Sequence, residues 1–193
     1  MIAVRSTVEG PARSALLLGG LAGAMTLRVA AGLGTNTAGV LFAVLLLATA
    51  AAAGWRPGVP RARALATGAG GAAVLCAVPV AMRLSGHTLV LGPPPLGLLP
   101  AWAATTVLIA VAEEALLRGV LMDAVSSWAG DLVAVAVAAI AFGLLHVPLY
   151  GWQAVPLDLA VGVWLGGLRL ATGGIAAPAT AHTLADLAYW WLR

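Results

Sequence analysis

The sequence predicts an all-α protein of the polytopic membrane class, a transmembrane helical bundle of about seven spans in seven or eight helices. Composition is the first observation, since the chain is 62% hydrophobic and 9% charged, whereas soluble domains carry about 25% charged residues. Apolar segments near the length of about 20 residues that crosses a bilayer follow one another along the chain. Breaks rich in proline and glycine separate them, as expected for the turns between spans.

The apolar segments define the expected spans in order. Arginines precede the first segment, which runs to about residue 33 and exceeds the apolar core of about 7–15 residues that a signal peptide has. We therefore expect an uncleaved first span. Residues 55–58 (Trp-Arg-Pro-Gly) separate the second span from the third, residues 92–95 (Gly-Pro-Pro-Pro) open the fourth, and Pro148 follows the fifth. The expected spans are residues 14–33, 37–54, 64–82, 98–122, 131–147, 154–172 and 175–192.

A single integral membrane domain, residues 1–193, is expected because no repeat or low-complexity linker divides the chain. Charged residues within a bilayer are costly, so they are candidates for function by default. The first three expected spans hold only Arg28, near an end, so we expect the catalytic half at about residues 98–193. The ionisable residues of the last four spans are Glu113, Glu114, Arg118, His146, Asp158, His182 and Asp186.

The arginines predict a cytoplasmic N-terminus, because positive residues concentrate on the cytoplasmic side of a membrane. With that orientation, the cytoplasmic side would hold Arg5, Arg13, Arg56, Arg61, Arg63 and Arg169, against Arg28, Arg83 and Arg193 on the other. The absence of lysine, with much alanine and glycine, suggests a GC-rich bacterial gene. We expect a multi-pass protein of the bacterial plasma membrane, surrounded by lipid. Scattered arginines form no basic patch, so no nucleic-acid partner is expected.

Two glutamates are adjacent in the fourth expected span, in the sequence Glu113-Glu114-Ala-Leu-Leu-Arg118. Neighbouring helical residues point about 100° apart, so the two carboxylates cannot face the same direction. Glu114 and Arg118 have the i,i+4 spacing of an ion pair, which leaves Glu113 without a local cation. A carboxylate in an apolar bundle suits a general base. The alternative is a purely structural Glu–Arg pair with Glu113 simply buried.

Two histidine motifs follow on later spans. Phe142 and His146 share a helix face by i,i+4 spacing, so the ring would orient the imidazole and exclude water. His182 and Asp186 have the same spacing, and Asp186 either orients His182 or joins it as a metal ligand. Asp158 has no basic partner at i+4, and its role stays open.

Several common site types are excluded. One cysteine, Cys76, allows neither an intrachain disulfide nor a zinc-thiolate site. The H-E-x-x-H helix of zinc peptidases and the G-x-S-x-G motif of serine hydrolases are both missing from the sequence. The pairs Gly19/Gly23 and Gly162/Gly166 are small-xxx-small motifs, which let helices approach closely.

Distance along the helices predicts a long fourth helix. At 1.5 Å per residue, His146 lies about 22 Å from the loop that precedes residue 131. Glu113 would lie about 14 Å from that loop if its helix stopped at residue 122, and about 21 Å if it continued to Ser127. We therefore expect the helix to extend to Ser127. By the same count His182 lies at a different depth.

Taken in order, E-E-x-x-x-R, F-x-x-x-H and H-x-x-x-D resemble the CPBP family, also called the Abi family, over residues 110–190. That family includes CAAX prenyl proteases and bacteriocin-processing enzymes. The resemblance implies an intramembrane endopeptidase in which Glu113 and His146 activate water. It also implies that His182 and Asp186 complete the site, as oxyanion-stabilising groups or as metal ligands.

By the same resemblance, Glu114 and Arg118 would be structural. The CAAX proteases of the family carry Asn where this chain has Asp186, and an ionised Asp would repel an oxyanion. Asp186 would then be protonated, orient His182 or bind a metal.

The expected cofactor is none or zinc. A catalytic zinc would use His146, His182 and Asp186 if Glu113 is the base. These ligands come from two helices at different depths by the count above, whereas a metal-free site needs only Glu113 and His146 around one water. We therefore expect no metal.

The expected substrate is a membrane-associated peptide or protein, and prenylated proteins are not expected in a bacterium. One alternative is a non-proteolytic membrane scaffold or bacteriocin-immunity factor, which the intact motifs disfavour. Another is a proton-coupled transporter that uses Glu113 and the histidines as a relay. No paired broken helices of the kind that transporters often show are evident in the sequence.

Overall fold

The computed structural model describes residues 9–84 and 96–192, and over these ranges the chain is helical without strands. Three features of the sequence lie outside the described residues: Arg5, the Gly-Pro-Pro-Pro break at residues 92–95, and Arg193. A π-helical segment, η2 (Ala115–Leu121), joins α4 to α5. Short 3-10 turns, η1 (Leu96–Leu98) and η3 (Trp152–Ala154), precede α4 and α7. The described α-helices are α1 (Glu9–Ala31), α2 (Asn36–Ala52), α3 (Ala62–Leu84), α4 (Leu99–Glu114), α5 (Met122–Ala129), α6 (Asp131–Tyr150), α7 (Val155–Thr172) and α8 (Ala176–Leu192).

The fourth helix is as long as the matched depths of Glu113 and His146 predict. Each of the seven apolar segments forms a helix, and the fourth runs without a break through α4, η2 and α5, since Ala115 and Met122 keep right-handed helical dihedrals. Extension to Ser127 is thereby confirmed. Gly130 ends this helix with φ +86°, a conformation that glycine adopts without steric cost. The chain therefore enters α6 at once.

The expected number of seven membrane spans is not confirmed. Among the described helices, three are long and apolar enough to cross a membrane: Gly10–Ala31, Asp131–Tyr150 and Trp152–Thr172. Two further apolar helices, Asn36–Ala52 and Ala62–Ala77, are shorter. α4 and α8 contain 16 and 17 residues, below the length of about 20 that crosses a bilayer, although α4 continues into η2 and α5.

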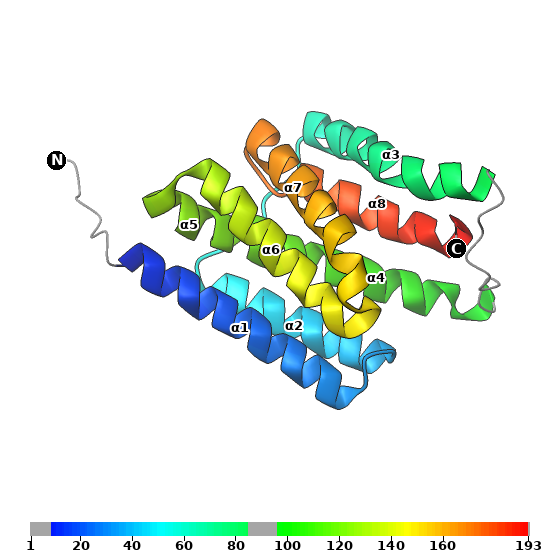
Figure 1. The fold of residues 1–193 in the computed structure, drawn as a ribbon, viewed down its shortest axis with the longest axis horizontal. Helices are drawn as coiled ribbons and strands as arrows, with labels where there is room; N and C mark the ends of the chain where they lie inside the picture. The colour runs from blue at the N-terminus through cyan, green and yellow to red at the C-terminus, as the bar shows by residue number, and fades with distance from the viewer. Residues whose placement is uncertain (1–8, 85–95, 193) are drawn as a thin grey trace.

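The helices pack with the fourth at the centre (Figure 1). α3 lies beside α8 on one side of the bundle and α1 beside α2 on the other, while α4 contacts both α2 and α8. All seven residues of η2 are buried. Apolar side chains on the outside remain exposed, as Leu16 (77%) and Leu132 (83%) show. An apolar exterior around a charged centre suits lipid surroundings.

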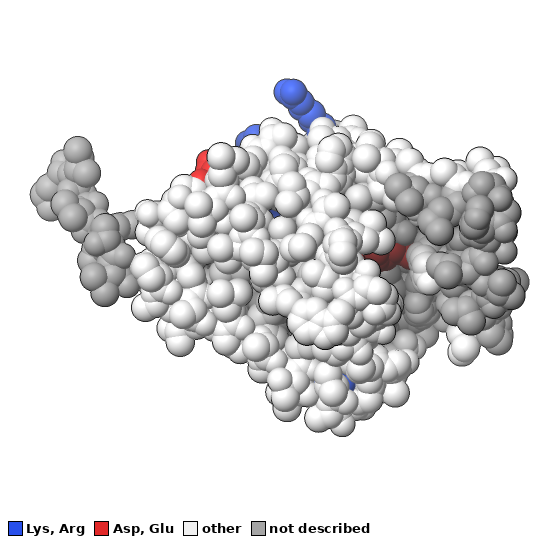
Figure 2. Space-filling view, viewed as in Figure 1, with Lys and Arg blue, Asp and Glu red and all other residues white. Residues whose placement is uncertain are grey.

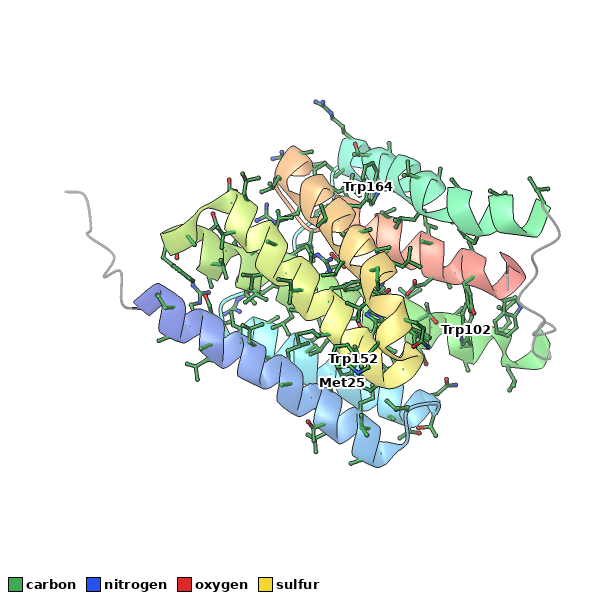
Figure 3. The ribbon with its side chains drawn as sticks, viewed as in Figure 1. Met25, Trp102, Trp152 and Trp164 are labelled. Atoms are coloured by element: carbon green, nitrogen blue, oxygen red, sulfur yellow. The ribbon has the colours of Figure 1, made fainter. Side chains whose placement is uncertain are left out.

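Small residues set the close helix contacts. A Cβ on Gly162 would lie 2.7 Å from Ala139 Cα, and one on Gly166 would lie 2.9 Å from Val135 Cγ1, so α7 requires glycine where it crosses α6. The predicted close approach is confirmed at Gly162 and Gly166. It is wrong at Gly19 and Gly23, where an added Cβ would have no atom of the described residues within 4 Å. Trp164 of α7 points toward α3 and donates from Nε1 to the Gly71 carbonyl at 3.3 Å (Figure 3).

Candidate active site

The two glutamates close α4 directly before the π-helical segment. Their side chains are almost fully buried, with Glu113 2% and Glu114 0% exposed. Within η2 the backbone pairing shifts, because the N–H of Met122 donates to Leu117, five residues back. Such π segments are rare in helices and are frequent at functional sites. The segment therefore marks the part of the long helix in which geometry departs from a regular α-helix.

Glu114 and Arg118 form the ion pair that their spacing predicts. Arg118 Nη1 lies 2.8 Å from Glu114 Oε1, and both side chains are fully buried. Arg118 Nη2 also donates to the Gly162 carbonyl at 3.2 Å, and its guanidinium lies 4.8 Å from the centre of the Phe142 ring. Arg118 therefore holds α6 and α7 against the fourth helix as well as neutralising Glu114.

His182 contacts both glutamates from α8. Its Nδ1 lies 2.9 Å from Glu114 Oε1, and its Nε2 lies 3.9 Å from Glu113 Oε2. Asp186 Oδ2 lies 3.3 Å from the same Nε2, as the i,i+4 spacing predicts. The expected difference in depth for His182 is therefore wrong. Counting residues from a loop assumes parallel helices that begin at one level, and α4 and α8 do not meet that assumption.

His146 approaches from α6 and packs on Phe142. Its Nδ1 lies 2.9 Å from the Phe142 carbonyl, and since a carbonyl only accepts, Nδ1 carries the proton and Nε2 is left for other partners. The centre of the Phe142 ring lies 4.5 Å from that of His146 and 5.4 Å from that of His182. The expected ring–imidazole contact is present, and Phe142 touches both histidines.

A cavity of about 300 Å³ opens in front of these groups. Glu113 lines it from α4, His146 and Tyr150 from α6, and Asp186 from α8. Because buried charges require partners, the sequence predicts that Glu113, His146 and His182 line one polar cavity. Glu113 and His146 do so, whereas His182 is not among the lining residues. An acidic side chain is visible at the floor of a hollow in an otherwise almost uncharged face (Figure 2). Trp102 of α4 forms part of the apolar wall (Figure 3).

Two arginines near the site are missing from the expected set. Arg28 of α1 lines the same cavity, and Arg169 of α7 donates from Nε to the Arg118 carbonyl at 2.9 Å. Both were interpreted from sequence only as charges near span ends. A lone arginine at the end of an apolar helix was the available signal, but spacing along the chain does not show which neighbour it meets. Asp158 Oδ2 is buried without a hydrogen-bond partner among the described residues, and no contact assigns it a role.

The residues expected as zinc ligands are His146, His182 and Asp186. Within residues 9–84 and 96–192, no three His, Cys, Asp or Glu side chains are placed together to hold an ion. His146 Nδ1 contacts a carbonyl, and His182 contacts Glu114 through Nδ1 and Asp186 through Nε2. The chemistry that these residues offer is therefore that of a buried carboxylate beside two imidazoles.

Comparison with known proteins gives one match. Residues 95–188 match the family described as type II CAAX prenyl endopeptidase Rce1-like. Neither the curated proteins nor the solved structures include a significant match to the chain. The matched segment contains both glutamates, Arg118 and both histidines, and it supports a CAAX-type intramembrane protease at the level of the family. The match over residues 95–188 is consistent with the CPBP family of CAAX-protease-like membrane proteins.

Proposed function

We propose that the protein is an intramembrane endopeptidase that cleaves a membrane-associated peptide or protein, with Glu113 and His146 activating water. One observation carries this proposal: Glu113 lines the cavity together with His146, while the adjacent Glu114 is occupied by Arg118 and His182. Two neighbouring carboxylates thus have different surroundings, and the one that faces the cavity is available to a water and a substrate.

The proposed reaction begins with a water held between Glu113 and the free Nε2 side of His146. Glu113 takes a proton as the water oxygen attacks the carbonyl carbon of the peptide bond. The proton then passes from Glu113 to the departing nitrogen as the C–N bond breaks. The products are a carboxylate and an amine, and Glu113 returns to its starting form.

Asp186 is proposed to orient His182. Its Oδ2 lies 3.3 Å from His182 Nε2, so Nε2 donates toward Asp186 and Nδ1 donates toward Glu114 at 2.9 Å. An ionised Asp186 would repel an oxyanion, but it would stabilise a doubly protonated, positively charged His182. This supports the orienting role over the oxyanion-stabilising role. Glu114 and Arg118 are the structural part of the site.

We also propose that residues 1–193 form one integral domain of a bacterial plasma membrane, crossing it several times with the N-terminus in the cytoplasm. The exposed apolar side chains and the distribution of arginines support this placement. The proposed mechanism uses no metal, because it needs only Glu113 and His146 around one water, and both line the cavity.

The full chain, purified in detergent, is tested against a library of apolar peptides that carry a fluorophore and a quencher. We expect the wild-type protein to cleave a subset. Glu113→Gln removes the base with little change in shape, and we expect a loss of about 10²- to 10⁴-fold, the usual contribution of a general base. Asp131→Asn is the matched control, since Asp131 is exposed at the start of α6 and contacts Ser126.

Cleavage by Glu113→Gln at the wild-type rate would remove Glu113 from the mechanism. Wild-type protein that cleaves nothing, but moves protons in liposomes in a manner dependent on Glu113, would favour the transporter instead. Loss of cleavage in Asp131→Asn as well would show that the assay responds to any lost carboxylate.

A further inference from the structure

Arg28 is a cation on the interior side of α1, far in sequence from the other charged groups of the site. It lies in the last turn of α1, outside the segment that matches the family. Its guanidinium lies 4.8 Å from the centre of the Phe42 ring, and Phe42 is fully buried. Arg28 is therefore turned toward Phe42 of α2.

The guanidinium is incompletely satisfied by the protein. Arg28 Nε is buried without a hydrogen-bond partner among the described residues. No ion pair joins Arg28 to a carboxylate within the described ranges, although Glu113 and Asp186 line the same cavity. A buried donor on a charged group is costly unless a partner binds it. A ligand in the cavity is the partner that the geometry allows.

The surroundings of Arg28 favour an anionic ligand. Thr35, which caps the start of α2, and Asn36, its first residue, line the same cavity, and helix N-termini attract negative charge. A guanidinium is planar and presents paired N–H donors that match a carboxylate. On the opposite wall Glu113 and Asp186 would repel an anion, which places the binding site for one on the side of α1 and α2.

We propose that Arg28 and the start of α2 form a subsite that binds a carboxylate of the peptide substrate. This inference rests on the proposed peptidase function and specifies its substrate class. The carboxylate is supplied either by the C-terminus of the peptide or by an Asp or Glu side chain near the cleaved bond. In both cases Arg28 positions the peptide with its carbonyl toward Glu113, and the substrate is acidic at one end.

The test measures binding of four synthetic peptides of one apolar hexapeptide sequence to the full chain in detergent. One peptide has a free C-terminus and one has a C-terminal amide. The other two are amidated and carry either Glu or Gln at one internal position. We expect the wild-type protein to bind one carboxylate peptide about 10- to 100-fold more tightly than its neutral counterpart, as a charged hydrogen bond contributes. The pair that shows the preference identifies the source of the carboxylate.

Arg28→Gln should abolish that preference. The control Arg63→Gln removes an exposed arginine of α3 and should retain it. Arg28→Lys should keep part of it, because the charge remains but the fork of N–H donors is lost. If Arg28→Gln does not fold, Arg28→Lys and the wild-type comparison decide the outcome.

Equal wild-type binding of both peptides in each pair would overturn the subsite, and so would an unchanged preference in folded Arg28→Gln. The same peptides are followed for cleavage in parallel. A protein that binds the carboxylate peptides through Arg28 but does not hydrolyse any of them would keep the subsite and remove the peptidase. Hydrolysis without any preference for the carboxylate peptides would keep the peptidase and remove the subsite.

Discussion

At the scale of single residues, Glu113 and Glu114 are neighbours with opposite surroundings. Glu114 is enclosed by Arg118 and His182, at 2.8 and 2.9 Å. Glu113 has a single ion-pair contact among the described residues, at 3.9 Å to His182, and faces the cavity. We therefore expect Glu114 to be needed for stability and Glu113 to be available for chemistry.

This division predicts different effects for the two amide substitutions. Glu114→Gln leaves Arg118 buried without its counter-charge, and breaking a buried pair in this way costs about 3–5 kcal/mol of unfolding free energy. Glu113→Gln removes no ion pair at hydrogen-bond distance and should change stability much less. Thermal unfolding of both variants in the same detergent measures the difference. Equal activity loss at equal thermal stability would reject the assignment.

The pairing of Glu114 with Arg118 and of His182 with Asp186 follows from i,i+4 spacing, so both could be predicted from sequence. The contact of His182 with Glu114 could not, because 68 residues separate them and helix periodicity does not specify which helices meet. The place of Arg28 in the cavity could not be predicted for the same reason, since its neighbours there come from other helices.

At the scale of helices, the length of the fourth helix could be predicted and its π-helical segment could not. Matching the depths of Glu113 and His146 required extension to Ser127, and the helix continues to Ala129. The shift to i→i+5 pairing in η2 arises from packing, because the whole segment is buried. Arg169 also donates to the Arg118 carbonyl there, a contact that local sequence does not encode.

The crossing of α6 and α7 predicts a matched pair of glycine substitutions. Gly162→Ala would place a Cβ 2.7 Å from Ala139 Cα, and overpacking of this kind costs about 1–3 kcal/mol. The carbonyl of Gly162 also accepts from Arg118, so displacement of α7 would disturb the site. Gly167 of the same helix has no atom near its Cβ position among the described residues, and Gly167→Ala is the control.

Thermal unfolding should show a clear loss of stability for Gly162→Ala and none for Gly167→Ala. Similar stabilities for both variants would indicate that α7 moves away at little cost, and would contradict a crossing fixed by glycine.

At the scale of the whole molecule, the all-helical fold followed from composition and apolar segments, while the packing order did not. Hydropathy locates segments but carries no information on which faces meet, so the placement of α3 beside α8 required the structure. Hydropathy also did not predict the number of helices long and apolar enough to span a membrane. α4 and α8 are short helices that carry the charged cluster, and composition alone does not rank them with α6 as spans.

The proposed mechanism predicts that activity does not depend on a bound metal. Elemental analysis of the purified protein should show no stoichiometric zinc, and treatment with a chelator should leave peptide cleavage unchanged. A catalytic zinc takes about three protein ligands, and no such group is assembled among the described side chains. Stoichiometric zinc, with activity lost to the chelator and restored by zinc alone, would contradict the metal-free site.

The central claim is that Glu113 makes water attack a peptide bond, and hydrolysis in oxygen-18 water tests it most directly. Bacterial membranes are incubated in that water with wild-type protein or with Glu113→Gln, and the peptides are analysed by mass spectrometry. We predict new C-termini that carry one labelled oxygen with the wild-type protein and their loss with Glu113→Gln. The same labelled termini formed at the same rate by both proteins, or none formed by the wild type, would contradict the account.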